Sequence, residues 1–172
     1  MFQNLQPNER VRQIADIDFK RLHLMGYRNY IFDVDNTLCR RKEISVSLAT
    51  QQLFQKLRTQ ALIEQVALLS NTVLPNPKRE QRIAMIAELL GIQHFVCARY
   101  PKVKPHPEPF LKTMALIGAK PETTVMIGDQ LFSDIKGGNR LGLYTILVEP
   151  LGDDHWITFP KRVLEKIAFR FL

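Results

Sequence analysis

Long apolar runs are missing from this 172-residue sequence, and cysteine is scarce. A run such as Val66–Leu69 falls far short of the ~20 residues that cross a bilayer. Met1–Arg12 has no apolar stretch and contains Glu9, which argues against a secretory signal peptide. The two cysteines, Cys39 and Cys97, form no Cys-x-x-Cys pair, so we expect neither a disulfide framework nor a zinc site. These absences favour a soluble protein of a reducing compartment.

The composition is that of a globular protein with an excess of basic residues. Hydrophobic residues make up 45% of the chain and charged residues 24%. The length predicts a single domain, with a lead over residues 1–27, a core over about 28–150 and a C-terminal helix over about 160–171. Lys and Arg number 24 against 17 Asp and Glu, a net charge of +7. Such an excess suggests an anionic partner: nucleic acid, an acidic membrane or a phosphorylated substrate.

Short apolar segments alternate with helical patterns along the chain. This alternation predicts an α/β fold, with a mainly parallel, Rossmann-like sheet and helices on both faces. The last helix is amphipathic, and either packs on the core or lies on a membrane. The expected strands cover residues 29–33, 64–70, 94–97, 124–127 and 144–148, and the expected helices 47–60, 78–90, 108–117, 134–141 and 160–171.

Polar and charged residues follow four of the predicted strands. Because ligands of such folds bind beyond the carboxyl ends of the strands, these residues are candidates for one site. Carboxylates gathered in one place repel, and a set without His or Cys suits the hard cation Mg²⁺. The candidates are Asp33, Asp35, Ser70, Asn71, Lys104, Asp129 and, one helical turn further on, Asp134.

Four motifs in this order resemble those of the haloacid dehalogenase (HAD) superfamily of phosphotransferases. They are Asp-Val-Asp-Asn-Thr at 33–37, Ser-Asn-Thr at 70–72, Lys-Pro at 104–105 and Gly-Asp-Gln-x-x-x-Asp at 128–134. The segment around the last motif, with Gly137–Arg140 and Tyr144–Val148, is similar to the phosphatidylglycerophosphate (PGP) phosphatase branch. The resemblance covers about residues 30–148, and the segment Leu5–Asp18 also resembles the lead of that branch.

The resemblance implies roles for these residues. Asp33 would be the nucleophile that forms an aspartyl-phosphate, and Asp35 would act as general acid and base. Mg²⁺ would be held by the carboxylates of Asp33 and Asp129 and by the backbone carbonyl of Asp35. The phosphate would be bound by Ser70, Asn71 and Lys104, with Thr37, Gly128 and Asp134 in support.

Two of these assignments leave alternatives. The branch carries an Arg-Lys-Pro cluster at its lysine motif, whereas here Arg99 is separated from Lys104 by a segment that contains Lys102. Lys104 fits the superfamily spacing, and Lys102 is the alternative. Asp134 is either a metal ligand or support, or the N-cap of the helix expected to begin there.

The spacing of the motifs leaves no room for a cap domain, which implies a capless (subclass III) phosphatase with an open site. Such a site suits a phosphorylated lipid, with the basic residues after the strands facing an anionic membrane surface. We therefore expect a PGP phosphatase inside the cell or an organelle, peripheral at the membrane. The alternatives are the same chemistry on a soluble nucleotide or sugar phosphate, and a binding module that uses its basic face. Without a nucleic-acid motif, we expect no nucleic-acid partner. The basic residues are Arg40, Arg41, Lys42, Lys78, Arg79, Arg99 and Lys102.

Overall fold

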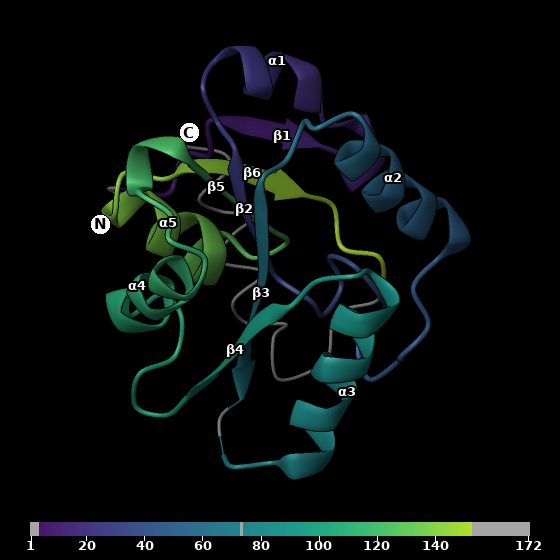
Figure 1. The fold of residues 1–172 in the computed structure, drawn as a ribbon. Helices are drawn as coiled ribbons and strands as arrows, with labels where there is room; N and C mark the ends of the chain where they lie inside the picture. Colours follow the sequence, from purple (N-terminus) through teal and green to yellow (C-terminus); the bar gives the residue numbers. More distant parts are fainter. Residues whose placement is uncertain (1–3, 73, 153–172) are drawn as a thin grey trace.

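A single parallel sheet forms the centre of the protein, as Figure 1 shows. The computed structural model describes residues 4–72 and 74–152. The sheet has six strands in the order β1-β6-β5-β2-β3-β4, and each neighbouring pair is parallel. This arrangement confirms the predicted fold class. The strands are β1 (Glu9–Val11), β2 (Asn29–Phe32), β3 (Gln65–Thr72), β4 (His94–Arg99), β5 (Thr124–Gly128) and β6 (Tyr144–Val148).

Helices cover both faces of the sheet, which explains why the central strands are mostly apolar and buried. Every residue of β2 and β5 is buried. Alternate residues of β2 point to opposite faces: Tyr30 and Phe32 pack with α1, α2 and α3, whereas Ile31 packs with α4. The helices are α1 (Phe19–Leu24), α2 (Leu48–Thr59), α3 (Pro77–Leu89), α4 (Pro107–Leu116) and α5 (Lys136–Arg140).

The five strands expected from the sequence are all present, and the helix boundaries follow local signals. Ser47 caps α2, because its side chain accepts a hydrogen bond from the backbone N–H of Thr50. Gly91 follows α3 with a φ of +62°, a left-handed conformation that glycine adopts without strain. The helix expected at 160–171 lies outside the described residues. None of the helices within the described ranges is long and apolar enough to span a bilayer.

The N-terminal lead supplies a strand and a helix that the sequence did not reveal. β1 pairs with β6 at the edge of the sheet, and α1 packs on the large core cluster through Phe19 and Leu22. The Asn8 side chain accepts a hydrogen bond of 2.8 Å from the backbone N–H of Thr145. The side chain of Asn139 donates to the carbonyl oxygens of Asn4 and Gln6. In the described residues the lead is therefore part of the main sheet, and the single-domain organisation of the whole chain stays a prediction.

Candidate active site

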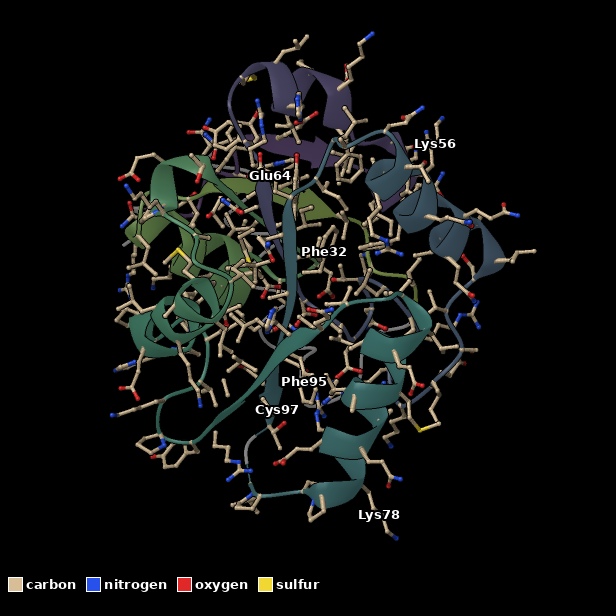
Figure 2. All side chains as sticks on the ribbon, viewed as in Figure 1. Phe32, Lys56, Glu64, Lys78, Phe95 and Cys97 are labelled. Carbon is tan, nitrogen blue, oxygen red and sulfur yellow. The ribbon has the colours of Figure 1, made fainter. Side chains whose placement is uncertain are left out.

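The loop after β2 forms the floor of the candidate site. Phe32, labelled in Figure 2, is the last residue of β2, and the buried Asp33 follows it. The chain then turns tightly: Asn36 has a φ of 64°, and its N–H donates to the carbonyl oxygen of Cys39. Thr37 is buried inside this turn. Burial raises the pKa of the Cys39 thiol to about 11, which keeps it protonated and agrees with a packing role.

Lys104 is the basic residue that reaches Asp33. Its Nζ lies 2.5 Å from Asp33 Oδ1 and 2.7 Å from Asp134 Oδ1, and donates to the carbonyl oxygen of Leu69 at 2.8 Å. Burial lowers the pKa of Lys104, but the charges of Asp134 and Asp33 more than offset this, so its pKa lies above the ordinary value. Lys102, the alternative, is exposed and pairs with Glu108. The geometry therefore favours Lys104.

Two small polar residues at the end of β3 lie beside this lysine. Both groups of the Asn71 side-chain amide bond to the backbone of Lys104: Oδ1 accepts from its N–H at 2.8 Å, and Nδ2 donates to its carbonyl oxygen at 3.2 Å. Asn71 thus holds in place the loop that contains Lys104, which we call the lysine loop. Ser70 is buried, and its Oγ lies 3.4 Å from the guanidinium of Arg79. Phosphate binding by Ser70 and Asn71 stays a prediction.

Three buried carboxylates meet beside Lys104. One carboxylate oxygen from each of Asp33, Asp129 and Asp134 lies within 4.8 Å of the others. Asp33 Oδ2 is buried and accepts no hydrogen bond from the described residues. Burial raises the pKa of Asp33, which the charge of Lys104 opposes. Clustered carboxylate oxygens with a single neighbouring ammonium group are a donor set that fits a hard cation such as Mg²⁺.

Asp134 belongs to this cluster and is not an N-cap. It lies inside a π-helix, Leu131–Ile135, which continues into α5, so the helix begins earlier than expected. Its Oδ2 accepts a hydrogen bond from the N–H of Gln130. A Cβ at Gly128 would lie 2.3 Å from the same oxygen, so this position has room for glycine alone. The π-helix brings the carboxylate of Asp134 against the end of β5.

Asp35 has partners that sequence reasoning missed. Arg79 and Arg82, both on α3, each donate to a different oxygen of its carboxylate. The sequence placed Arg79 among the basic residues expected to face an anionic membrane surface, which stays a prediction, and its pairing with Asp35 was not foreseen. Two other members of that set are also paired, Arg99 with Glu80 and Lys102 with Glu108. The available signal was the spacing of Arg79 and Arg82, which puts both on one face of a helix that starts near the end of β3.

A family comparison identifies this arrangement. The family model described as mitochondrial PGP phosphatase matches residues 2–151. The chain belongs to the PGP phosphatase family. The "Probable phosphatase YqeG" of Bacillus subtilis (strain 168) is 32% identical over 161 residues, which cover 93% of this chain and 87% of YqeG. The family and this relative make the chain a phosphatase.

Solved structures agree with the fold of this PGP phosphatase family member. An uncharacterized protein from Listeria monocytogenes serotype 4b has a TM-score of 0.57 at 18% identity, covering 84% of this chain and 99% of the other. The HAD hydrolase YfnB from Bacillus subtilis, whose structure contains magnesium, has a TM-score of 0.53 at 15% identity, covering 81% and 99%. The fold is therefore of the HAD type. Between Asp33 and Lys104 the described residues hold only α2, β3, α3, β4 and their loops, which leaves the site without a cap.

Proposed function

We propose that the protein is a Mg²⁺-dependent phosphomonoester hydrolase that converts phosphatidylglycerophosphate to phosphatidylglycerol. The observation that carries this proposal is the pairing of Asp33 with Lys104 at the edge of a buried carboxylate cluster. A carboxylate and a phosphate repel each other, so a site that joins them needs positive charge. Lys104 supplies one charge, and the cluster can hold a cation that supplies more. The match to the PGP phosphatase family supports the lipid substrate.

In the first half of the reaction, an oxygen of Asp33 attacks phosphorus in line and forms an aspartyl-phosphate. The bond between phosphorus and the leaving oxygen breaks, and Asp35, which would take up a proton from solvent before this step, gives it to the departing alkoxide. In the second half, Asp35 takes a proton from water as the water oxygen attacks phosphorus. The bond to Asp33 then breaks, which releases inorganic phosphate and restores both carboxyl groups.

The surrounding residues bind the phosphoryl group and balance its charge. Lys104 neutralises the oxygens of the transferring group from the side of Asp33, and Ser70 donates a hydrogen bond to them. Asp33, Asp129 and Asp134 would hold Mg²⁺ together with the backbone carbonyl of Asp35. When bound, Mg²⁺ supplies charge neutralisation between the nucleophile and the phosphate.

The open site supports a large substrate whose remainder stays outside the protein. Beside the nucleophile loop lies a hollow of about 580 Å³, lined by Asn36, Arg40, Arg41 and residues 150–152 among others. Arg40 lines this hollow, and both Arg40 and Lys42 are exposed; these two residues form what we call the basic rim. Basic groups at this edge suit a phosphate that is presented by an anionic lipid surface. The enzyme would then work at the membrane face while its substrate remains in the bilayer.

A phosphatase assay tests this function. Release of phosphate would be measured from phosphatidylglycerophosphate in mixed micelles and from a panel of soluble nucleotide and sugar phosphates. We expect the lipid to give the highest kcat/KM, and EDTA to abolish turnover until Mg²⁺ is restored. Asp33→Asn should remove turnover, because an amide is a poor nucleophile, while Glu122→Gln, at an exposed position before β5, serves as a folded control. Faster turnover of a soluble phosphate would refute the lipid substrate, and full activity of Asp33→Asn would refute the mechanism.

A further inference from the structure

The carboxylate of Asp35 is held from two sides by arginines of α3. Arg82 Nη2 lies 2.5 Å from Oδ1, and Arg79 Nη2 donates to Oδ2. Two guanidinium groups therefore share one carboxylate, which leaves one positive charge in excess at this point. A surplus charge beside a phosphate-binding site favours a further anion.

The two arginines differ in their freedom to bind a ligand. The side chain of Arg82 is 10% exposed, and its Nη1 also donates to the carbonyl oxygen of Glu43 at 2.7 Å. The side chain of Arg79 is 25% exposed, and its Nη2 also reaches Ser70 Oγ at 3.4 Å. Arg82 is thus fixed to the protein, whereas Arg79 lies between solvent and the predicted phosphate position.

Two other cations near the site are held by acidic side chains. Lys104 is buried between Asp33 and Asp134, and Arg99 pairs with Glu80 at 2.6 Å. Arg79 is different because Asp35 keeps its ion pair with Arg82 when Arg79 turns to another anion. An unpaired buried charge is costly, and the exchange of Asp35 for another anion at Arg79 creates none.

We propose that Arg79 is a specificity-determining residue that binds a second anionic group of the substrate, next to the phosphate that is cleaved. The chemical class is a phosphomonoester that carries a phosphodiester a few bonds away. This inference rests on the proposed function, because the headgroup of phosphatidylglycerophosphate has a phosphodiester and a phosphomonoester on the same glycerol. A guanidinium binds phosphate oxygens through two parallel hydrogen bonds, which a lysine cannot reproduce.

Two soluble substrates test the role of Arg79 without a membrane. The deacylated headgroup, glycerophosphoglycerol phosphate, carries both phosphates, and glycerol 3-phosphate carries only the monoester. We expect the wild-type protein to prefer the deacylated headgroup. Arg79→Gln should lower its kcat/KM about 10- to 100-fold, chiefly through KM, as expected for a lost charged hydrogen bond. For glycerol 3-phosphate the loss in kcat/KM should be clearly smaller, because Arg82 still holds Asp35 while no second phosphate contact is lost.

Two further variants complete the experiment. Arg79→Lys keeps the charge but not the paired hydrogen bonds. Its preference for the deacylated headgroup over glycerol 3-phosphate should therefore fall between those of the wild type and Arg79→Gln. Lys56→Gln removes an equal charge from exposed α2, at the end of the sheet near Glu64 in Figure 2, and should change neither substrate. Equal losses on both substrates in Arg79→Gln and Arg79→Lys would overturn the inference while the proposed function stands. A wild-type protein without preference for the second phosphate would also overturn the inference, whereas the proposed function fails only if phosphatidylglycerophosphate itself is a poor substrate.

Discussion

The acidic side chains of the site differ in the basic residues that they pair with. Asp33 and Asp134 share one buried lysine, whereas Asp35 has two arginines. The lysine therefore leaves the pair Asp33 and Asp134 with negative charge in excess, while the arginines leave the surroundings of Asp35 positive. Two adjoining regions of opposite charge suit the two parties of phosphoryl transfer, a cation on one side and an anionic substrate on the other.

Replacement of Lys104 tests how strongly the carboxylate cluster depends on the ammonium group of this lysine. Lys104→Met should lower the free energy of unfolding by about 3–5 kcal/mol without metal, because the paired carboxylates stay buried without a partner. The deficit should grow between pH 5 and pH 8. Burial raises the pKa of Asp33 and the charge of Lys104 opposes this rise, so the variant should have a higher Asp33 pKa than the wild type. The folded variant then binds more protons than its unfolded chain over a wider pH range, and its stability falls further than that of the wild type as the pH rises. Urea denaturation at both pH values provides the measurement.

Lys102→Met is the matched control for this experiment, because Lys102 is exposed and pairs only at the surface with Glu108. It should change the unfolding free energy by less than about 1 kcal/mol. Added Mg²⁺ should narrow the Lys104→Met deficit, since a more negative cluster binds the cation more strongly. An unchanged urea midpoint for Lys104→Met would contradict the view of a cluster that depends on its lysine.

At the scale of elements, α5 is pressed closely against α4 and the lysine loop. A Cβ at Gly137 would lie 2.4 Å from the ring of Phe110 and 3.3 Å from the Cα of Pro105, which follows Lys104. Gly137 thus allows α5 to approach α4 closely while Lys104 keeps its place between Asp33 and Asp134. The position of Lys104 therefore depends on the contact between α5 and α4, which lie further along the chain.

Gly137→Ala tests this close packing by the sign of its effect. Helix propensity alone would stabilise α5 by about 1 kcal/mol. The clash with Phe110 should instead destabilise the protein by about 1–3 kcal/mol and reduce turnover, because Pro105 and Lys104 must shift. Denaturant unfolding and the phosphatase assay measure both effects. Arg140→Ala, at an exposed position of the same helix, is the control, and a more stable Gly137→Ala variant would disprove the packing argument.

Elements with a strong local signal were predictable, and those that depend on distant partners were not. β2 and β5 are buried on both faces and read as apolar runs, so their positions and the residues at their ends followed from the sequence. β1 has only the residues Glu9–Val11, without an apolar pattern, and forms because β6 lies beside it. The pairing of Asp35 with Arg79 and Arg82 depends on where α3 lies over the loop that follows β2. The spacing of the two arginines puts them on one helix face, but no local pattern places that face against Asp35.

At the scale of the whole molecule, exposed basic residues lie at the end of the sheet where the site is. Lys78 marks that end in Figure 2, and Lys56 lies toward the opposite end. Hydrolysis of lipid in anionic vesicles should therefore fall steeply as salt rises, while hydrolysis of a soluble phosphate should change less. Phosphate release at increasing NaCl measures both. Equal salt responses would remove the argument for electrostatic docking.

Charge variants make this prediction specific to one end of the molecule. Arg40→Gln combined with Lys42→Gln should weaken vesicle binding by roughly tenfold or more, since each basic group near an anionic surface contributes ~1 kcal/mol. Lys56→Gln combined with Lys20→Gln removes the same charge from exposed positions outside the basic rim and should leave vesicle binding near the wild-type value. Vesicle co-sedimentation measures the binding directly. Equal losses in both double variants would assign the effect to net charge alone.

The pairing of β1 with β6 also governs the order in which the molecule can be assembled. Asn8 and Thr145 are hydrogen-bonded across 137 positions of sequence, so within the described sheet the strand that is synthesised first pairs with the strand that is synthesised last. On a ribosome, the edge of β1 has no partner until β6 has emerged, by which time Asp33, Lys104 and Asp129 have all been made. We therefore expect closure of the lead onto β6 to be a late event of folding, which completes the sheet only after every proposed catalytic group has been made.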